Sequence, residues 1–114
     1  EAPAIAVARR LAEEHAEVTV TDPKALDNAR EDLKDLGGRV VYELDPYRAA
    51  ENTHAIAIIT GWDEYATLDY KRIYDSMEKP AFIFDGCHCV DRHTMYDIGF
   101  NVIPLGQPIQ AKHV

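Results

Sequence analysis

Short apolar runs alternate with segments of helical periodicity along most of the chain, and this alternation restricts the possible folds more than any other sequence feature. The runs are rich in residues that favour strands, and they lie at 18–20, 40–41, 55–60, 81–84 and 100–103. Parallel neighbours in a sheet need a crossover connection, and a helix is the compact way to make one. The sequence therefore predicts an α/β fold built on a parallel sheet.

Cap and breaker residues predict where the helices begin and end. Asp45 and Asp69 are expected to cap two helix starts, and Gly99 is expected to end a third helix. Another helix is predicted from Pro3, with the apolar face Ile5, Ala8, Leu11 and Ala12. The run 55–60 is apolar on both faces, so it is predicted to be a central strand covered on both sides. We expect a Rossmann-like parallel sheet of about five strands with helices on both faces.

Composition restricts the partners and the compartment. The 114 residues carry a formal charge of -8, which disfavours binding to nucleic acid through its phosphate backbone. No apolar run approaches the roughly 20 residues that span a bilayer, so no membrane partner is expected. The length and composition favour a single domain. The two cysteines are interpreted as thiols of a reducing compartment, which favours a cytoplasmic protein. Because Glu1 opens directly into a helical pattern, we expect the sequence to be a segment of a longer chain.

The candidate site lies in the turns that follow the predicted strands, because ligands of such sheets bind outside the carboxyl ends of the strands. This rule selects Thr21–Asp22, Thr60–Asp63 and Asp85–His88. Neither the G-x-G-x-x-G loop nor the G-x-x-x-x-G-K-[ST] loop is present. The sequence therefore does not favour a dinucleotide enzyme that is complete in itself.

Two cysteines and two histidines form the cluster that most resembles a metal set: Cys87, His88, Cys89 and His93. Zinc ligands are normally spaced C-x₂₋₄-C, and a C-x-C on extended chain points its thiols to opposite sides. We therefore expect two small half-buried thiols and no metal. A Cys87 nucleophile with His88 or His93 as its base is the other hypothesis.

Trp62 and Asp85 each allow two interpretations. Trp62 could stack on a base or a sugar, or it could pack on a helix at the edge of the sheet. Asp85 could accept a hydrogen bond from a ribose hydroxyl, or it could cap its own turn through nearby backbone amides, which is the commoner role.

Several short motifs together resemble one family. They are Ala2-Pro3-Ala4-Ile5, Asp45-Pro46-Tyr47 with Ala50, His54-Ala55-Ile56, Thr60-Gly61-Trp62-Asp63-Glu64-Tyr65, Leu68-Asp69-Tyr70 and Lys79-Pro80-Ala81-Phe82-Ile83-Phe84-Asp85-Gly86. In this order they resemble the C-terminal, UDP-binding domain of the UDP-glucose 6-dehydrogenases, in the UDP-glucose/GDP-mannose dehydrogenase family. The resemblance covers residues 1–106, and 107–114 is expected to be an irregular tail.

The resemblance implies an oxidoreductase that converts UDP-glucose to UDP-glucuronate with two NAD molecules in succession. In that family a cysteine of the N-terminal domain forms the covalent intermediates, and the N-terminal domain binds most of the NAD. This chain is thus implied to hold no catalytic residue, to be inactive alone, and to work with the remaining domains of an enzyme that forms a homo-oligomer. Its implied substrate-binding residues are Phe84, Asp85, Gly86 and Cys87 in the pocket wall, with Trp62 as support.

Two positions depart from the family pattern. Cys87 stands where the family usually has arginine, and Gly61 stands where it usually has glutamate. A guanidinium contact to a diphosphate sugar contributes about 1.5–3 kcal/mol, so its loss should weaken binding. The alternatives are a dehydrogenase of another nucleotide sugar (GDP-mannose or a UDP-aminosugar) and a non-catalytic nucleotide-binding module.

Overall fold

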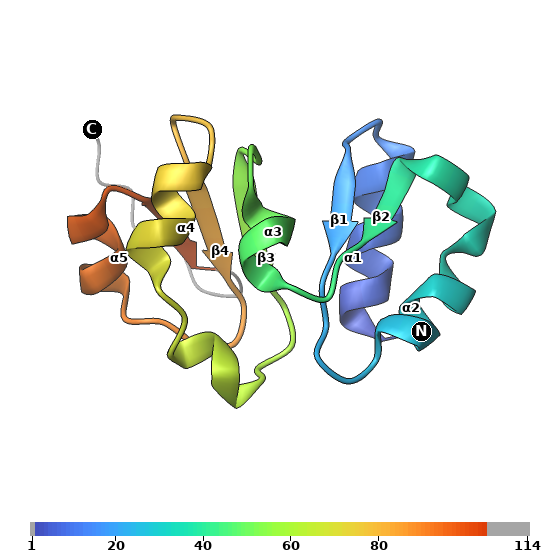
Figure 1. Ribbon diagram of the computed structural model, residues 1–114, viewed down its shortest axis with the longest axis horizontal. Helices are drawn as coiled ribbons and strands as arrows, with labels where there is room; N and C mark the ends of the chain where they lie inside the picture. The colour runs from blue at the N-terminus through green and yellow to red at the C-terminus, as the bar shows by residue number, and fades with distance from the viewer. Residues whose placement is uncertain (1, 105–114) are drawn as a thin grey trace. The chain divides into compact units, whose positions relative to one another are not determined.

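The computed structural model describes residues 2–104, and the predicted tail 107–114 lies outside the described residues. The chain divides into two compact units, an N-terminal unit of residues 1–50 and a C-terminal unit of residues 51–114 (Figure 1). None of the helices in the described part is long and apolar enough to cross a membrane.

The N-terminal unit consists of two parallel strands and the helices around them. Its elements are α1 (Pro3–Glu13), β1 (Val18–Val20), α2 (Leu26–Asp32), the 3-10 helix η1 (Lys34–Arg39), β2 (Val40–Tyr42) and α3 (Pro46–Ala50). β1 pairs with β2 in register from Val18 opposite Val40. The core of this unit is formed by Ile5, Ala8, Ala12, Ala29, Leu33 and Val40. Leu11, which was predicted to lie on the same face of α1, is 44% exposed and is not part of this core.

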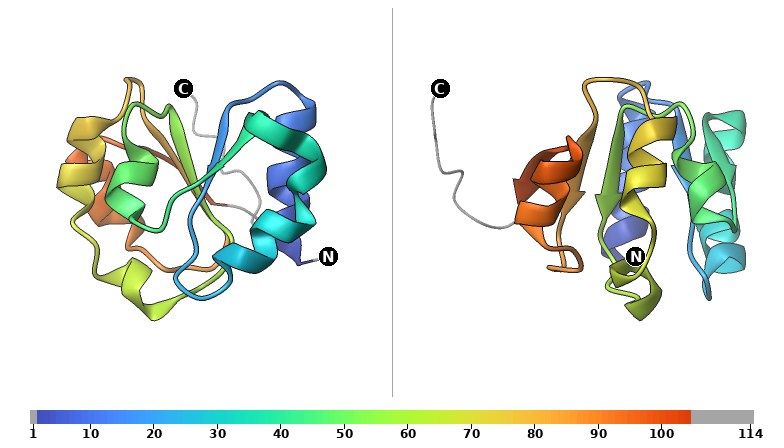
Figure 2. Two further views of the ribbon diagram at one scale, coloured as in Figure 1. Left: turned by 45° about the vertical axis from the view of Figure 1, so that its right-hand side comes forward. Right: turned by 60° about the vertical axis from the view of Figure 1, so that its left-hand side comes forward.

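The C-terminal unit consists of three parallel strands and two connecting helices. Its elements are β3 (Ala55–Ile58), the 3-10 helix η2 (Asp63–Ala66), α4 (Tyr70–Ser76), β4 (Phe82–Asp85), α5 (Arg92–Ile98) and β5 (Asn101–Pro104). The strand order is β3-β4-β5, and α4 and α5 contact each other (Figure 2). The predicted caps are confirmed, since Asp69 accepts from the Arg72 amide and Gly99 ends α5 with a positive φ of 132°.

The α/β class and the parallel pairing are confirmed, with one correction. The five strands among the described residues pair as a two-stranded parallel sheet in the N-terminal unit and a three-stranded parallel sheet in the C-terminal unit. The central strand of the larger sheet is β4, and β3 lies at its edge with Ala55 and Ala57 exposed. The prediction of a central strand at 55–60 is therefore wrong for this sheet. An apolar run on both faces fits any strand in an α/β fold and does not determine which strands pair beside it.

Candidate functional site

Two loops meet at the carboxyl edge of the larger sheet. β3 and β4 are parallel and in register, with Ile58 opposite Asp85, so both chains leave the sheet on the same side. The Gly86 amide donates to the Ile58 carbonyl at 2.9 Å. A Cβ placed on Gly61 would lie 3.4 Å from the Cβ of Cys87. The loop after β3 (the Gly61 loop, residues 59–62) therefore contacts the loop after β4 (the Asp85 loop, residues 85–90).

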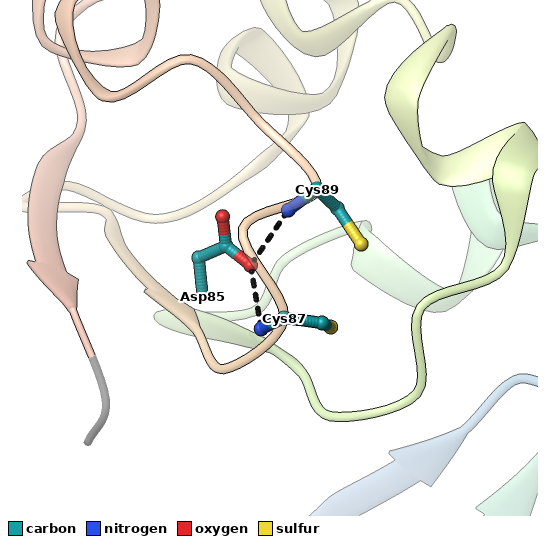
Figure 3. A group of neighbouring side chains, drawn as sticks. All are labelled: Asp85, Cys87 and Cys89. Carbon is teal, nitrogen blue, oxygen red and sulfur yellow. Dashed lines mark hydrogen bonds between the residues drawn. The ribbon is translucent and has the colours of Figure 1, made fainter.

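Asp85 organises its own loop from the end of the central strand. It is only 7% exposed. One carboxylate oxygen accepts from the amides of Cys87 at 3.1 Å and Cys89 at 3.2 Å (Figure 3). The other accepts from the Val90 amide at 3.2 Å. Three backbone donors thus satisfy both oxygens of a buried carboxylate. The turn-capping role predicted for Asp85 is confirmed.

The Cys87 thiol lies between the two strand ends. Its sulfur donates to the Ile58 carbonyl at 3.3 Å. Burial raises the pKa of Cys87 to about 12, and the hydrogen bond to Cys89 and the negative charges of Cys89 and Asp85 act in the same direction. The group is therefore a protonated thiol at neutral pH. Since the thiolate is the reactive form of cysteine, this environment slows any attack by Cys87 and does not suit the hypothesis of a catalytic Cys87 nucleophile.

The two cysteine side chains lie on the same side of the loop, contrary to the prediction from C-x-C spacing (Figure 3). That prediction assumed extended backbone, whereas His88 has a positive φ of 54°. This left-handed residue turns the chain between the cysteines. Their sulfur atoms consequently lie within 4.8 Å of each other and of a carboxylate oxygen of Asp85.

The same three residues are the one group in the described part of the chain with ligand atoms gathered closely enough to hold a metal ion. The set fits zinc poorly. The Asp85 oxygens already accept from backbone amides, and two thiols leave a tetrahedral ion without half of its ligands.

The remaining predicted site residues are spread over this edge of the sheet. Phe84 and Asp85 are consecutive in β4 and thus point to opposite faces, with Phe84 half-buried. Gly86 is exposed at the start of the Asp85 loop. Trp62 is half-buried and precedes η2. The third predicted turn, Thr21–Asp22, belongs to the N-terminal unit, where Asp22 accepts from two amides that precede α2.

A cleft of about 390 Å³ adjoins the Asp85 loop. Cys89 and Val90 line it from that loop, and residues at the beginnings of α4 and α5, including Tyr70 and Thr94, line it from the helices. The sequence did not predict this cleft, the Ile58 carbonyl as a partner of Cys87, or the contact of Gly61 with Cys87. Only the position of Gly61 in a turn after a strand indicated that it would lie near the site.

Comparison with known proteins gives a consistent result. The model of the UDP-glucose/GDP-mannose dehydrogenase family, UDP binding domain, matches residues 1–92. The chain is 40% identical to a UDP-glucose 6-dehydrogenase of Caenorhabditis elegans over 97% of this chain and 25% of that protein. It is 40% identical to that of Drosophila melanogaster (96% and 25%) and 37% identical to UDP-glucose 6-dehydrogenase 3 of Oryza sativa subsp. japonica (97% and 27%). The chain thus spans about a quarter of the length of the curated relatives it matches.

Proposed function

The chain belongs to the UDP-glucose/GDP-mannose dehydrogenase family, and on this basis we propose that it completes the nucleotide-sugar pocket of an NAD-dependent UDP-glucose 6-dehydrogenase. The observation that carries the proposal is the meeting of the Gly61 and Asp85 loops at the carboxyl edge of a parallel sheet. This edge is where ligands of α/β sheets bind. The same edge carries the residues that match the family motif.

The proposal assigns binding to this chain and the chemistry to the remaining domains of the same enzyme. No residue of this chain is assigned a catalytic role, and the absence of a G-x-G-x-x-G loop is consistent with NAD binding mainly elsewhere. The full enzyme is proposed to be a cytoplasmic homo-oligomer that oxidises UDP-glucose to UDP-glucuronate. A dehydrogenase of GDP-mannose or of a UDP-aminosugar is the alternative within the family.

Within the proposed pocket, Phe84, Asp85, Gly86 and Cys87 form the wall, and Trp62 supports the neighbouring loop. Asp85 acts by position, because its carboxylate holds the amides of Cys87, Cys89 and Val90. The absence of a side chain at Gly86 lets a ligand approach the backbone closely. The proposed wall is therefore largely backbone, in a conformation that one buried carboxylate maintains.

An NMR titration of the 114-residue chain with UDP-glucose tests the proposal. We expect the amide signals of Gly61, Gly86 and Cys87 to shift together with one dissociation constant, and GDP-mannose to bind more weakly. In the presence of NAD the chain alone should form no NADH, because no nucleophile or dinucleotide loop is assigned to it. Shifts confined to other residues, or none at saturating ligand, would contradict the placement of the pocket.

In the full-length enzyme, replacing Cys87 by arginine is expected to tighten binding of UDP-glucose about ten-fold or more. A guanidinium offers a planar fork with a permanent charge, whereas the thiol offers a weak hydrogen bond and already donates to Ile58. Calorimetric titration at two ionic strengths measures the gain, which should shrink with salt. Cys87→Ser, which adds no charge, is the control and should not tighten binding. Unchanged affinity in Cys87→Arg would mean that residue 87 does not face the ligand.

A non-catalytic nucleotide-binding module is the second candidate function. It is favoured by the contact between the two positions that depart from the family pattern, since the Cβ of Cys87 lies 3.4 Å from a Cβ built on Gly61. Binding of UDP-glucose and UDP with equal affinity would favour this module, because a dehydrogenase subsite must also recognise the sugar.

A further inference from the structure

The Asp85 loop holds two thiols in a position that extended chain would not give them. The sulfur atoms of Cys87 and Cys89 lie within 4.8 Å of each other, and neither cysteine is in a disulfide. Asp85 fixes the backbone of both cysteines by accepting from the Cys87 and Cys89 amides. The positive φ of His88 turns the chain between them. A disulfide requires the sulfur atoms to approach to about 2.05 Å. The disulfide therefore requires rotation about the Cα–Cβ bond of at least one of the two cysteines.

The two thiols differ in their surroundings. Cys89 is half-buried and lines the cleft of about 390 Å³ beside α4 and α5. Cys87 donates to the Ile58 carbonyl. Cys89 is therefore placed to react first with a reagent in the cleft, and Cys87, which lies beside it, is placed to displace the reagent.

We propose that Cys87 and Cys89 are a reversible modification site that forms an intrachain disulfide with a small disulfide such as oxidised glutathione. The Cys89 thiolate attacks one sulfur of oxidised glutathione, forms a mixed disulfide and releases one glutathione thiolate. The Cys87 sulfur then attacks the Cys89 sulfur, the proton of Cys87 is lost to solvent, and a second glutathione thiolate leaves. Two protein thiols are oxidised and one glutathione disulfide is reduced. The inference does not depend on the proposed function, because it rests on the geometry of the thiols alone.

Mass spectrometry of the reduced 114-residue chain in glutathione buffers tests the proposal. After alkylation of free thiols, wild type should contain a species that has lost two hydrogen atoms and carries no alkyl group or glutathione. Cys87→Ser should retain glutathione on Cys89, because it lacks the displacing thiol. A wild-type chain that accumulates the mixed disulfide instead, or that remains fully alkylated in the most oxidising buffer, would overturn the proposal.

Two substitutions at His88 test whether the disulfide forms because of the folded shape of the loop or only because the two cysteines are close in sequence. Both His88→Gly and His88→Val remove the imidazole and keep both thiols, but only glycine adopts a positive φ without strain. The equilibrium constant for the intrachain disulfide should be about ten-fold higher in His88→Gly than in His88→Val. It should also be higher in folded wild type than in the same chain in urea. Equal equilibrium constants in these comparisons would show that the folded loop does not favour the disulfide, and would overturn the proposal.

Adding zinc to the reduced chain tests whether Asp85, Cys87 and Cys89 form a metal site instead. Because the Asp85 oxygens accept from three amides, we expect no stoichiometric zinc after gel filtration. One bound zinc per chain that is lost in Cys89→Ser would assign the pair to a metal site and would overturn the proposal.

Discussion

Replacing Asp85 by alanine is expected to lower the free energy of unfolding of the C-terminal unit by about 3 kcal/mol. The side chain is buried and accepts from three backbone amides, and each buried donor left without a partner costs roughly 1–3 kcal/mol. Water at this edge of the sheet should form hydrogen bonds with some of the three amides that lose the carboxylate. The expected loss of unfolding free energy is therefore near the lower end of what three such amides could cost. Urea unfolding followed by the fluorescence of Trp62, the one tryptophan in the sequence, measures the change.

Two further variants make this result interpretable. Asp85→Asn keeps one oxygen, which can still accept from the Cys87 and Cys89 amides, but its amino group cannot accept from Val90. Its loss of stability should therefore lie between those of wild type and Asp85→Ala. Asp97→Ala removes an exposed aspartate of α5 and should change stability by less than about 0.5 kcal/mol. An Asp85→Ala chain as stable as Asp97→Ala would show that the loop does not depend on the carboxylate.

Features determined by neighbouring residues could be predicted from the sequence. Asp69 and Gly99 were correctly placed at helix ends because a cap acts within one turn of its own helix. The strand positions followed from apolar runs bounded by breakers in the same way. The turn-capping role of Asp85 was also predictable, because aspartate before glycine commonly accepts from amides a few residues ahead.

Features determined by distant residues or by one unusual backbone angle could not be predicted. The edge position of β3 depends on which strands pair, and an apolar run carries no information about its neighbours. The closeness of Cys87 and Cys89 depends on the φ of His88. Histidine is enriched at positive φ, but most histidines adopt a negative φ. An extended backbone from Cys87 to Cys89 was therefore the expectation from sequence, and it is wrong here. The contact between Gly61 and Cys87 could not be predicted either, because it depends both on the pairing of β3 with β4 and on the conformation of the Asp85 loop.

Replacing Gly99 by alanine is expected to destabilise the C-terminal unit by about 3 kcal/mol. Gly99 has a φ of 132°, which strains any residue with a Cβ. That Cβ would also lie 2.6 Å from the Cζ atom and 2.7 Å from the hydroxyl oxygen of Tyr74. The Tyr74 ring cannot move away easily, because it packs edge-on against Phe100 at 5.2 Å and lies under the Lys79 ammonium at 4.3 Å. Overpacking of this kind typically costs about 1–3 kcal/mol beyond the backbone strain.

The backbone strain at Gly99 and the steric overlap with Tyr74 can be measured separately, with a substitution at a second glycine and with a double variant. Gly37 also has a positive φ, of 57°, but no atom lies within 4 Å of a Cβ built on it. Gly37→Ala should therefore lose only the backbone strain, about 1–3 kcal/mol at a φ of 57° and a ψ of -136°, measured by urea unfolding followed by circular dichroism. Adding Tyr74→Ala to Gly99→Ala should cost less than Tyr74→Ala costs in wild type, because the smaller side chain removes the steric overlap. If the two substitutions instead add without coupling, the loss at Gly99 comes from the backbone angle and not from the tyrosine ring.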